Sequence, residues 1–297
     1  MQPFPTLDTV LVRQLLSAQF PQWASLPLAP VVPGGWDNRT FRLGDALLVR
    51  LPSAEAYVEQ VEKEQHWLPW LAPQLPLPIP APVAQGLPDA GYPWPWSIYR
   101  WLRGEPASAA SVADGVQFAR DLAGFLRALH RVDSGKGPPP GPHNFFRGGP
   151  LQVYDTETRT AVEGLAGAID AVEVLAVWDA ALASASDAAP VWVHGDLARS
   201  NLLVEAGALC SVIDFGCTAV GDPACDLVIA WTFFDAPARQ AFREALPLNP
   251  GCWARGRGWA LWKAVITLAP LQVEARPRHE AWQVLHQVLA DHVRADG

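Results

Sequence analysis

Hydrophobic and polar positions follow two different periods in the first third of the chain. Short apolar runs bounded by Gly, Pro, Asn and Asp predict strands. Longer segments with apolar residues every three to four positions predict helices. In chain order we expect a helix over 7–20, strands over 28–32, 39–43 and 46–51, a helix over 54–71, a proline-rich segment over 75–82 and an aromatic strand over 96–102.

The rest of the chain is predicted to be mainly helical. Its clearest helix is 111–132, where Phe118, Leu122 and Leu129 share one face. We place a domain boundary at Arg103-Gly104, which gives domains 1–103 and 104–297. The further elements are a loop over 134–150, a helix pair over 157–185, helices over 223–235, 237–246, 252–269 and 279–294, and short strands over 191–193, 202–204 and 209–213.

Composition narrows the class of protein. Half of the 297 residues are hydrophobic and 18% are charged, which excludes a disordered chain. Apolar stretches such as 227–234 are far shorter than a membrane span, and the first residues do not resemble a signal peptide. The net charge of −8 argues against a nucleic-acid partner. Four cysteines without metal-site spacing are expected to be reduced, so we predict a cytoplasmic protein.

The strongest chemical signal is the run His194-Gly-Asp196-Leu-Ala-Arg-Ser-Asn201, followed by Asp214-Phe-Gly216. Asp196 lies in a loop after a predicted strand, where a carboxylate can point into a cleft and act as a base. A predicted hairpin separates Asn201 from Asp214, so we expect these two side chains to lie side by side. An amide oxygen and a carboxylate are hard ligands suited to Mg²⁺.

This run resembles the kinase catalytic loop, His-x-Asp-x-x-x-x-Asn, and the Asp-Phe-Gly metal motif. With Gly in second place and Gly221-Asp-Pro-Ala-Cys-Asp226 close behind, the chain is similar over nearly its whole length to the aminoglycoside phosphotransferase family. The resemblance implies an α+β, two-lobed, protein-kinase-like fold, with a small N-lobe of antiparallel sheet and one helix, and a larger, mainly helical C-lobe. It also implies Mg²⁺ and ATP, or GTP in its place, as cofactors.

The same resemblance implies a role for each residue of these motifs. Asp196 would be the catalytic base, and Asn201 and Asp214 the Mg²⁺ ligands. His194 would hold the backbone of the loop, and Asp226 would brace it. Asp222, followed by Pro223, is first of all the N-cap of a helix.

The helix over 54–71 has one carboxylate on its apolar face. Because a buried charge needs a partner, Glu64 is expected to pair with Arg50 at the end of the preceding strand. The kinase pattern has Lys at this strand position, where it contacts the ATP phosphates. Arg50 either binds Glu64 and a phosphate together or forms a purely structural ion pair with Glu64. The other residues on this face are Tyr57, Val61, Leu68 and Leu71.

Two further segments are candidates for nucleotide binding. Gly34-Gly35, between the first two strands, either folds over phosphates or forms a bare turn. The strand over 96–102 is expected beside the nucleotide, with Tyr99 and Trp101 contributing to its site.

We expect the acceptor to be a small hydroxylated molecule, since only five residues separate Gly216 from Asp222 and no Ala-Pro-Glu motif follows. Six bases against four acids in 250–297 disfavour polycationic aminoglycosides, unless acids of the middle segment compensate. Arg255 and Arg257 either recognise the acceptor or face solvent. The C-terminal helices also carry four tryptophans, which we expect in the core, with stacking on the acceptor as the alternative: Trp253, Trp259, Trp262 and Trp282. The acids of the middle segment that could compensate are Asp155, Glu157 and Glu163.

The sequence thus predicts a kinase that transfers the ATP γ-phosphoryl group to a hydroxyl of a small metabolite or of an aminoglycoside-like acceptor. One alternative is a nucleotide-binding pseudokinase, a regulator with Arg50 as its inactivating mark. Another is a choline- or homoserine-type kinase on the same fold. We expect no nucleic acid, no membrane and no obligate protein partner.

Overall fold

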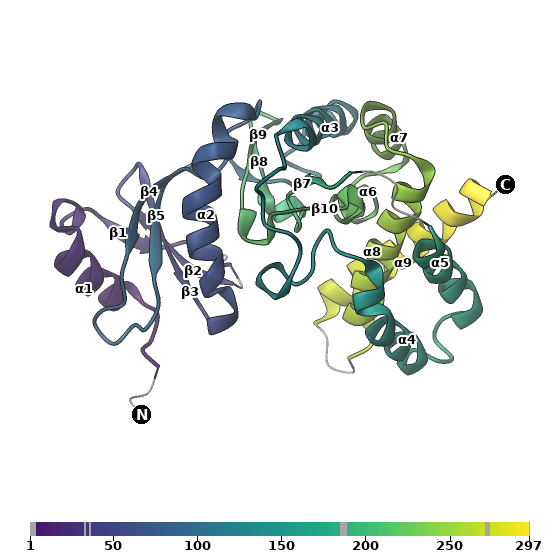
Figure 1. The fold of residues 1–297 in the computed structure, drawn as a ribbon, viewed down its shortest axis with the longest axis horizontal. Coiled ribbons are helices and arrows are strands. Elements are labelled where there is room, and N and C mark those ends of the chain that lie inside the picture. The colour runs from purple at the N-terminus through teal and green to yellow at the C-terminus, as the bar shows by residue number, and fades with distance from the viewer. Residues whose placement is uncertain (1–3, 33, 36, 185–188, 271–273, 297) are drawn as a thin grey trace. The chain divides into compact units, whose positions relative to one another are not determined.

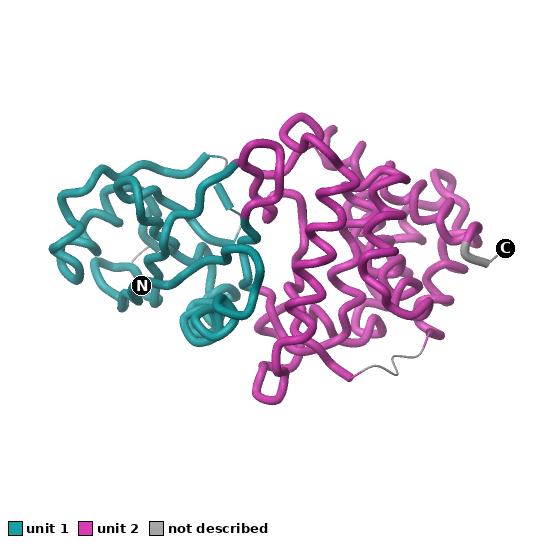
Figure 2. The backbone as a smooth tube through the Cα atoms, turned by 90° about the horizontal axis from the view of Figure 1, so that it is seen from above, with its two compact units in different colours: residues 1–104, 211–216 teal, residues 105–210, 217–297 magenta. Residues whose placement is uncertain are grey.

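A computed structural model describes residues 4–32, 34–35, 37–184, 189–270 and 274–296. Contacts divide the chain into two compact units, residues 1–104 with 211–216 and residues 105–210 with 217–297 (Figure 2). The segment 211–216, which contains Asp214, therefore groups with the first unit, although it follows most of the second in the sequence. Within the described residues, none of the helices combines the length and the hydropathy needed to cross a membrane.

The first unit is built on a five-stranded antiparallel sheet in the order β1-β2-β3-β5-β4 (Figure 1). The four strands predicted in this part are confirmed, and β4 is an addition. It was not predicted because it begins with a proline after a proline-rich run, and proline is tolerated at a sheet edge. The strands span β1 Leu28–Pro30, β2 Asn38–Leu43, β3 Leu47–Pro52, β4 Pro82–Gly86 and β5 Trp96–Arg100.

Two helices cover opposite faces of this sheet (Figure 1). Helix α1 (Thr9–Gln19) begins at Asp8, whose carboxylate accepts from the first backbone amides, and its apolar face packs with Val49 and Ile98. Because successive strand residues point to opposite faces, Arg50 and Tyr99 face the other way, toward α2 (Val58–Leu71). This alternation gives the sheet one apolar face and one face with polar chemistry.

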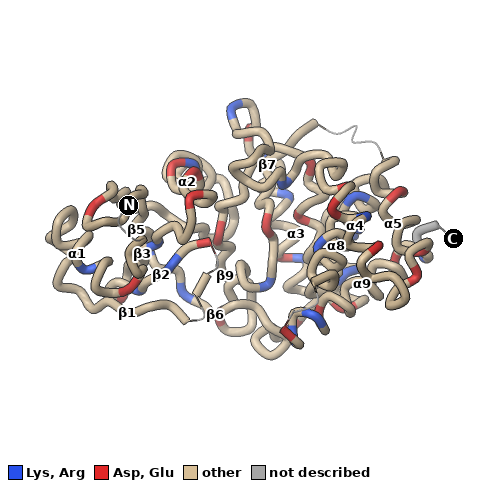
Figure 3. Tube along the Cα trace, turned by 90° about the horizontal axis from the view of Figure 1, so that it is seen from below, with Lys and Arg blue, Asp and Glu red and all other residues tan. Residues whose placement is uncertain are grey.

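The second unit contains the remaining helices and short strands, except that the last two residues of one strand, β9 (Ala208–Val212), belong to the first unit. Strands β7 (Val191–Val193) and β10 (Ala219–Gly221) pair antiparallel, and β6 (Glu105–Pro106), β8 (Leu202–Glu205) and β9 are neighbours in that order. The helices are α3 Gly115–Arg131, α4 Asp155–Gly164, α5 Ala171–Ala183, α6 Ile229–Thr232, α7 Ala236–Ala245, α8 Pro250–Leu268 and α9 Ala275–Asp296. Acidic and basic positions are interspersed along the trace of each unit (Figure 3).

Helix α8 is central to the second unit and packs against α4, α5 and α9. Its buried residues lie on every side, as expected of a helix enclosed by others. Gly258 lets α5 approach closely, since a Cβ there would lie 2.6 Å from the Cβ of Ala181. The helices predicted over 252–269 and 279–294 are thus confirmed.

The prediction of one continuous α-helix over 223–235 is wrong. The segment 223–235 forms a 3₁₀ turn over Pro223–Val228 and then the one-turn helix α6. Residues 223–231 are all buried, so they have none of the two-sided pattern that favours a surface α-helix. The turn instead directs the Asp226 carboxylate inward.

Candidate active site

In the first unit, Arg50 joins β3 to α2. Its Nη1 donates to both carboxylate oxygens of Glu64, at 3.2 and 3.1 Å. The Tyr99 hydroxyl on β5 donates to the same carboxylate, and the Arg50 guanidinium lies 5.6 Å from the centre of the Tyr99 ring. Glu64 is 3% exposed, so its charge is compensated inside the fold. The pair predicted from helix periodicity is present.

Arg50 has a second carboxylate partner. Its Nη2 donates to Asp214 Oδ1 at 2.7 Å. Asp214 has a φ of +67°, a conformation that is uncommon for a residue other than glycine. Burial disfavours the charged guanidinium, yet the carboxylates of Glu64 and Asp214 more than offset it and raise the pKa of Arg50. Arg50 is therefore a permanent cation that fixes the position of Asp214.

In the second unit, the loop after β7 presents Asp196. Gly195 has a φ of +84°, and a Cβ at this position would collide with the carbonyl oxygen of Cys217, so the turn requires glycine. Asp226 accepts from the backbone amides of His194 and Gly195, each at 2.8 Å. His194 is fully buried, and its Nδ1 accepts from the Asp196 amide at 3.2 Å. Through these hydrogen bonds, Asp226 and His194 hold the backbone of the Asp196 loop.

The pKa values of Asp226 and Asp196 shift in opposite directions. The pKa of Asp226 is raised by burial, despite the two amides and His194. Burial would also raise the pKa of Asp196, but the charges of Lys263 and Arg147 outweigh it and hold that pKa below its usual range. Asp196 is therefore a carboxylate at neutral pH.

Asn201 is oriented by the same loop. Its Nδ2 donates to the backbone oxygen of Asp196 at 2.9 Å, and this bond fixes which end of the amide is the oxygen. The Ser200 hydroxyl lies 3.4 Å from that oxygen. Asn201 therefore presents its amide oxygen as an acceptor beside the Asp196 loop, and its role as a metal ligand stays a prediction.

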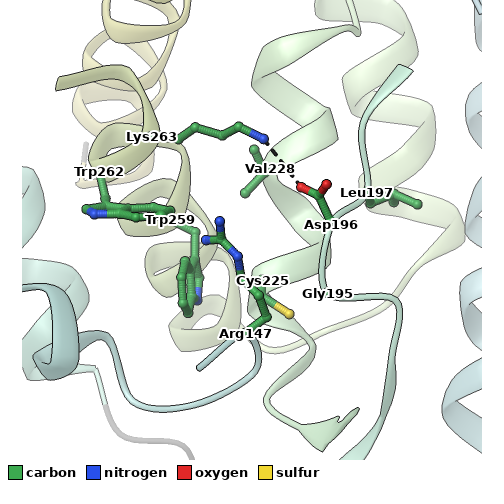
Figure 4. A pocket seen from close by; sticks show the side chains of 9 residues that line it. All are labelled: Arg147, Gly195, Asp196, Leu197, Cys225, Val228, Trp259, Trp262 and Lys263. Carbon is green, nitrogen blue, oxygen red and sulfur yellow. Dashed lines mark ion pairs between the residues drawn. The ribbon is translucent and has the colours of Figure 1, made fainter. Parts of the chain in front are cut away.

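A pocket in the second unit surrounds Asp196 (Figure 4). Lys263 Nζ lies 3.5 Å from Asp196 Oδ1, and Arg147 points into the same space. The Arg147 guanidinium stacks on Trp262, 4.5 Å from the ring centre, and lies 5.4 Å from that of Trp259. The remaining lining residues are Gly195, Leu197, Cys225 and Val228.

A family model described as the phosphotransferase enzyme family matches residues 29–262, more than half of the chain. The chain belongs to this family. The predicted membership is confirmed, and the matched residues include Arg50, Asp196 and Asp214. No curated protein matches the sequence.

Solved structures of phosphotransferases share the fold. An aminoglycoside 2′-phosphotransferase in complex with GDP matches with a TM-score of 0.72 at 19% identity, covering 96% of this chain and 99% of that one. A macrolide 2′-phosphotransferase from Brachybacterium faecium matches with a TM-score of 0.58 at 23% identity, covering 94% and 98%. A mutant aminoglycoside phosphotransferase in complex with AMP-PNP and hygromycin B matches with a TM-score of 0.63 at 18% identity, covering 96% of this chain and 98% of that one. The predicted kinase-like fold is confirmed.

The remaining residues that were predicted to bind the nucleotide in this phosphotransferase are exposed or make other contacts. Gly34 and Gly35 are exposed, and the Gly35 carbonyl accepts from Arg39 Nη1 at 3.0 Å. Trp101 follows β5, and its ring lies 4.0 Å from the Arg42 guanidinium. The roles of Gly34, Gly35, Tyr99 and Trp101 in nucleotide binding stay predictions.

The acceptor role considered for Arg255 and Arg257 does not agree with the structure, and neither side chain faces solvent. Both are buried in α8. Arg255 pairs with Asp222, with its Nη2 3.1 Å from Oδ1, and Arg257 pairs with Asp291 at 3.3 Å. Asp222 also caps the turn that follows it, by accepting from the Ala224 amide at 3.1 Å.

Sequence reasoning missed Arg147 and Lys263. Lys263 had a signal, because Trp259, Trp262 and Lys263 stand at i, i+3 and i+4 on one face of α8. Arg147 had none, since it lies in a loop rich in glycine and proline. Trp259 and Trp262 are buried as predicted, and both also line the pocket.

Proposed function

We propose that this phosphotransferase transfers the γ-phosphoryl group of ATP to a hydroxyl of a small molecule, with Asp196 as the base. The observation that supports this most is the ionised Asp196 carboxylate at a pocket, on a loop held by Asp226 and His194. A base must be deprotonated and fixed before it can orient a nucleophile.

The reaction follows from this arrangement. The acceptor hydroxyl donates its hydrogen bond to Asp196, and its oxygen forms a bond to the γ-phosphorus while the bond to the ADP oxygen breaks. The hydroxyl proton passes to Asp196. Because the pKa of Asp196 is held low, it takes the proton late, and its main contribution is to orient the hydroxyl.

The donor chemistry of two side chains suits Mg²⁺. Asn201 offers an amide oxygen whose orientation is fixed by its own Nδ2, and Asp214 offers a carboxylate held by Arg50. Mg²⁺, when bound with the nucleotide, supplies neutralisation of phosphate charge. We propose that Arg50, anchored by Glu64, adds a further positive charge for the phosphates. Since ATP is made and used in the cytoplasm, we place the enzyme there.

Phosphorus NMR of the protein with ATP, Mg²⁺ and a panel of hydroxylated compounds tests the proposal. The expected result is a new phosphate monoester signal that grows with the ADP signals. Asp196→Asn is expected to remove it, whereas Asp45→Asn, at an exposed turn, leaves it unchanged. A monoester formed at the same rate by Asp196→Asn contradicts the assigned base.

A further inference from the structure

Among the residues that the structure describes, the Arg147 guanidinium at the pocket has no acidic partner. No described residue places a carboxylate oxygen within ion-pair distance of it, and its Nε is buried without a hydrogen bond. Its contacts are the faces of Trp262 and Trp259. A cation held on aromatic faces keeps its N–H groups free for an anion, which a guanidinium can bind through two parallel hydrogen bonds.

The backbone that presents Arg147 is built to hold one position. Phe145 and Phe146, which precede it, have φ values of +54° and +53°, an uncommon conformation for bulky residues. Asn144 is fully buried, and its Nδ2 donates to the backbone oxygens of Arg147 and Cys217, at 2.9 and 3.2 Å. A loop held in this conformation by buried hydrogen bonds fixes the direction in which Arg147 leaves the backbone.

Lys263 supplies a second cation beside Asp196. Its side chain is 44% exposed, and its one ion pair among the described residues is with Asp196. Asp196 is the only acidic residue among those lining the pocket, against the two cations. An anion beside the reacting hydroxyl would therefore meet two positive groups and one negative one.

Sites that a cationic acceptor would use are already filled. Arg147 covers the face of Trp262, and Tyr154 packs against the same ring with centroids 4.2 Å apart. Glu157 accepts from Trp262 Nε1 at 2.7 Å, and Asp155 binds Arg159 and Trp178. Neither an aromatic cage nor a free carboxylate from this set remains for an ammonium group.

We propose that the acceptor has an anionic group, a carboxylate or a phosphate, close to its reacting hydroxyl, and that Arg147 and Lys263 bind this group. The inference rests on the proposed function in one respect, that Asp196 receives the hydroxyl. Arg147 and Lys263 are binding residues in this account, and Trp262 positions Arg147.

Four matched probes that share a six-carbon polyol test this charge preference: D-glucitol, D-gluconate, D-glucitol 6-phosphate and D-glucamine. Binding is measured by calorimetry with ADP and Mg²⁺ present, so that a nucleotide fills the phosphate site. At least one anionic probe is expected to bind about tenfold or more tightly than neutral glucitol, and glucamine more weakly than glucitol. The carboxylate and phosphate arms show which anion is preferred.

Variants assign the preference to its residues. Arg147→Gln is expected to remove most of it, Lys263→Gln to reduce it, and Arg147→Lys, which keeps the charge, to retain part of it. Arg276→Gln, on a side chain 80% exposed in α9, is the matched control. Arg50→Gln separates binding at the pocket from binding at the nucleotide phosphate site.

Four results would each overturn the inference. They are equal binding of all four probes, binding of glucamine that is tighter than that of glucitol, no measurable binding of either anion, and an anion preference that survives Arg147→Gln. Because the assay needs no turnover, its outcome is separate from that of the proposed function. Anion binding without phosphate transfer would remove the proposed function alone. Transfer to neutral or cationic acceptors, without an Arg147-dependent anion preference, would remove this inference alone.

Discussion

Arg50 Nη2 lies 2.7 Å from Asp214 Oδ1, while its Nη1 binds Glu64. One guanidinium thus connects a strand, a helix and the Asp-Phe-Gly segment within the first unit. A lysine at this position has a single ammonium nitrogen and no planar fork, so it cannot reproduce the geometry of two nitrogens that each bind a different carboxylate. We therefore predict that arginine and lysine at this position are not functionally equivalent in this chain.

Arg50→Lys tests this difference. We expect kcat to fall by roughly tenfold to a hundredfold, because Asp214 loses its fixed position while the local charge is kept. Steady-state kinetics measure the effect, and Arg120→Lys at an exposed position of α3 is the control. A rise in activity would instead mean that Arg50 restrains the enzyme, as the pseudokinase alternative requires.

Glu64→Gln leaves a buried guanidinium with a single carboxylate partner. We expect it to lower the free energy of unfolding by about 2–3 kcal/mol, since an incompletely compensated buried charge is costly. Tyr99→Phe, which removes only the hydroxyl bond to Glu64, should cost about 1 kcal/mol. Urea unfolding compares the two, and equal losses would show that the Tyr99 bond, not the ion pair, holds Glu64.

The pH dependence of kcat follows from the charges around Asp196. Because the pKa of Asp196 is lowered, its carboxylate stays ionised well into the acid range. Activity that depends on this carboxylate is therefore lost only as the pH falls below the usual pKa of an aspartate. Lys263→Gln removes the largest of the lowering charges, so the acid limb of kcat should shift toward higher pH. Arg276→Gln should leave the limb in place. An unmoved limb in Lys263→Gln would show that Lys263 does not set the ionisation of Asp196.

His130 on α3 predicts an acid-sensitive stability. Burial lowers its pKa to about 4, from 6.5 in the unfolded chain. The unfolded state therefore takes up the proton first as pH falls, and stability declines between about pH 6.5 and 4. The expected contribution of His130 is about 1–2 kcal/mol between pH 7.5 and 5. Urea unfolding of His130→Phe at both values should show a smaller decline than the wild type.

The sequence predicted those parts of the site that local periodicity determines. Glu64 was found because it interrupts an apolar helical face, and Arg50 because it ends the preceding strand. The Asp196 loop was found because its residue spacing is specific. In each case the information lies within a single element or in two that are adjacent in the chain.

Contacts set by tertiary packing were beyond such reasoning. The Arg50–Asp214 ion pair joins residues 164 positions apart. Arg147 depends on two non-glycine residues in a left-handed conformation, which no propensity favours. Arg255 was considered for the acceptor, and its burial against Asp222 follows from how α8 is enclosed. The predicted neighbourhood of Asn201 and Asp214 stays a prediction.

Whether Asp196 is the base of phosphoryl transfer is tested by separating nucleotide binding from chemistry. Single-turnover transfer from radiolabelled ATP, with the acceptor found by phosphorus NMR, is compared in the wild type and Asp196→Asn, with ATP affinity measured in parallel. We predict an unchanged ATP affinity for Asp196→Asn and a transfer rate lower by about a thousandfold. Transfer by Asp196→Asn at the wild-type rate would contradict it.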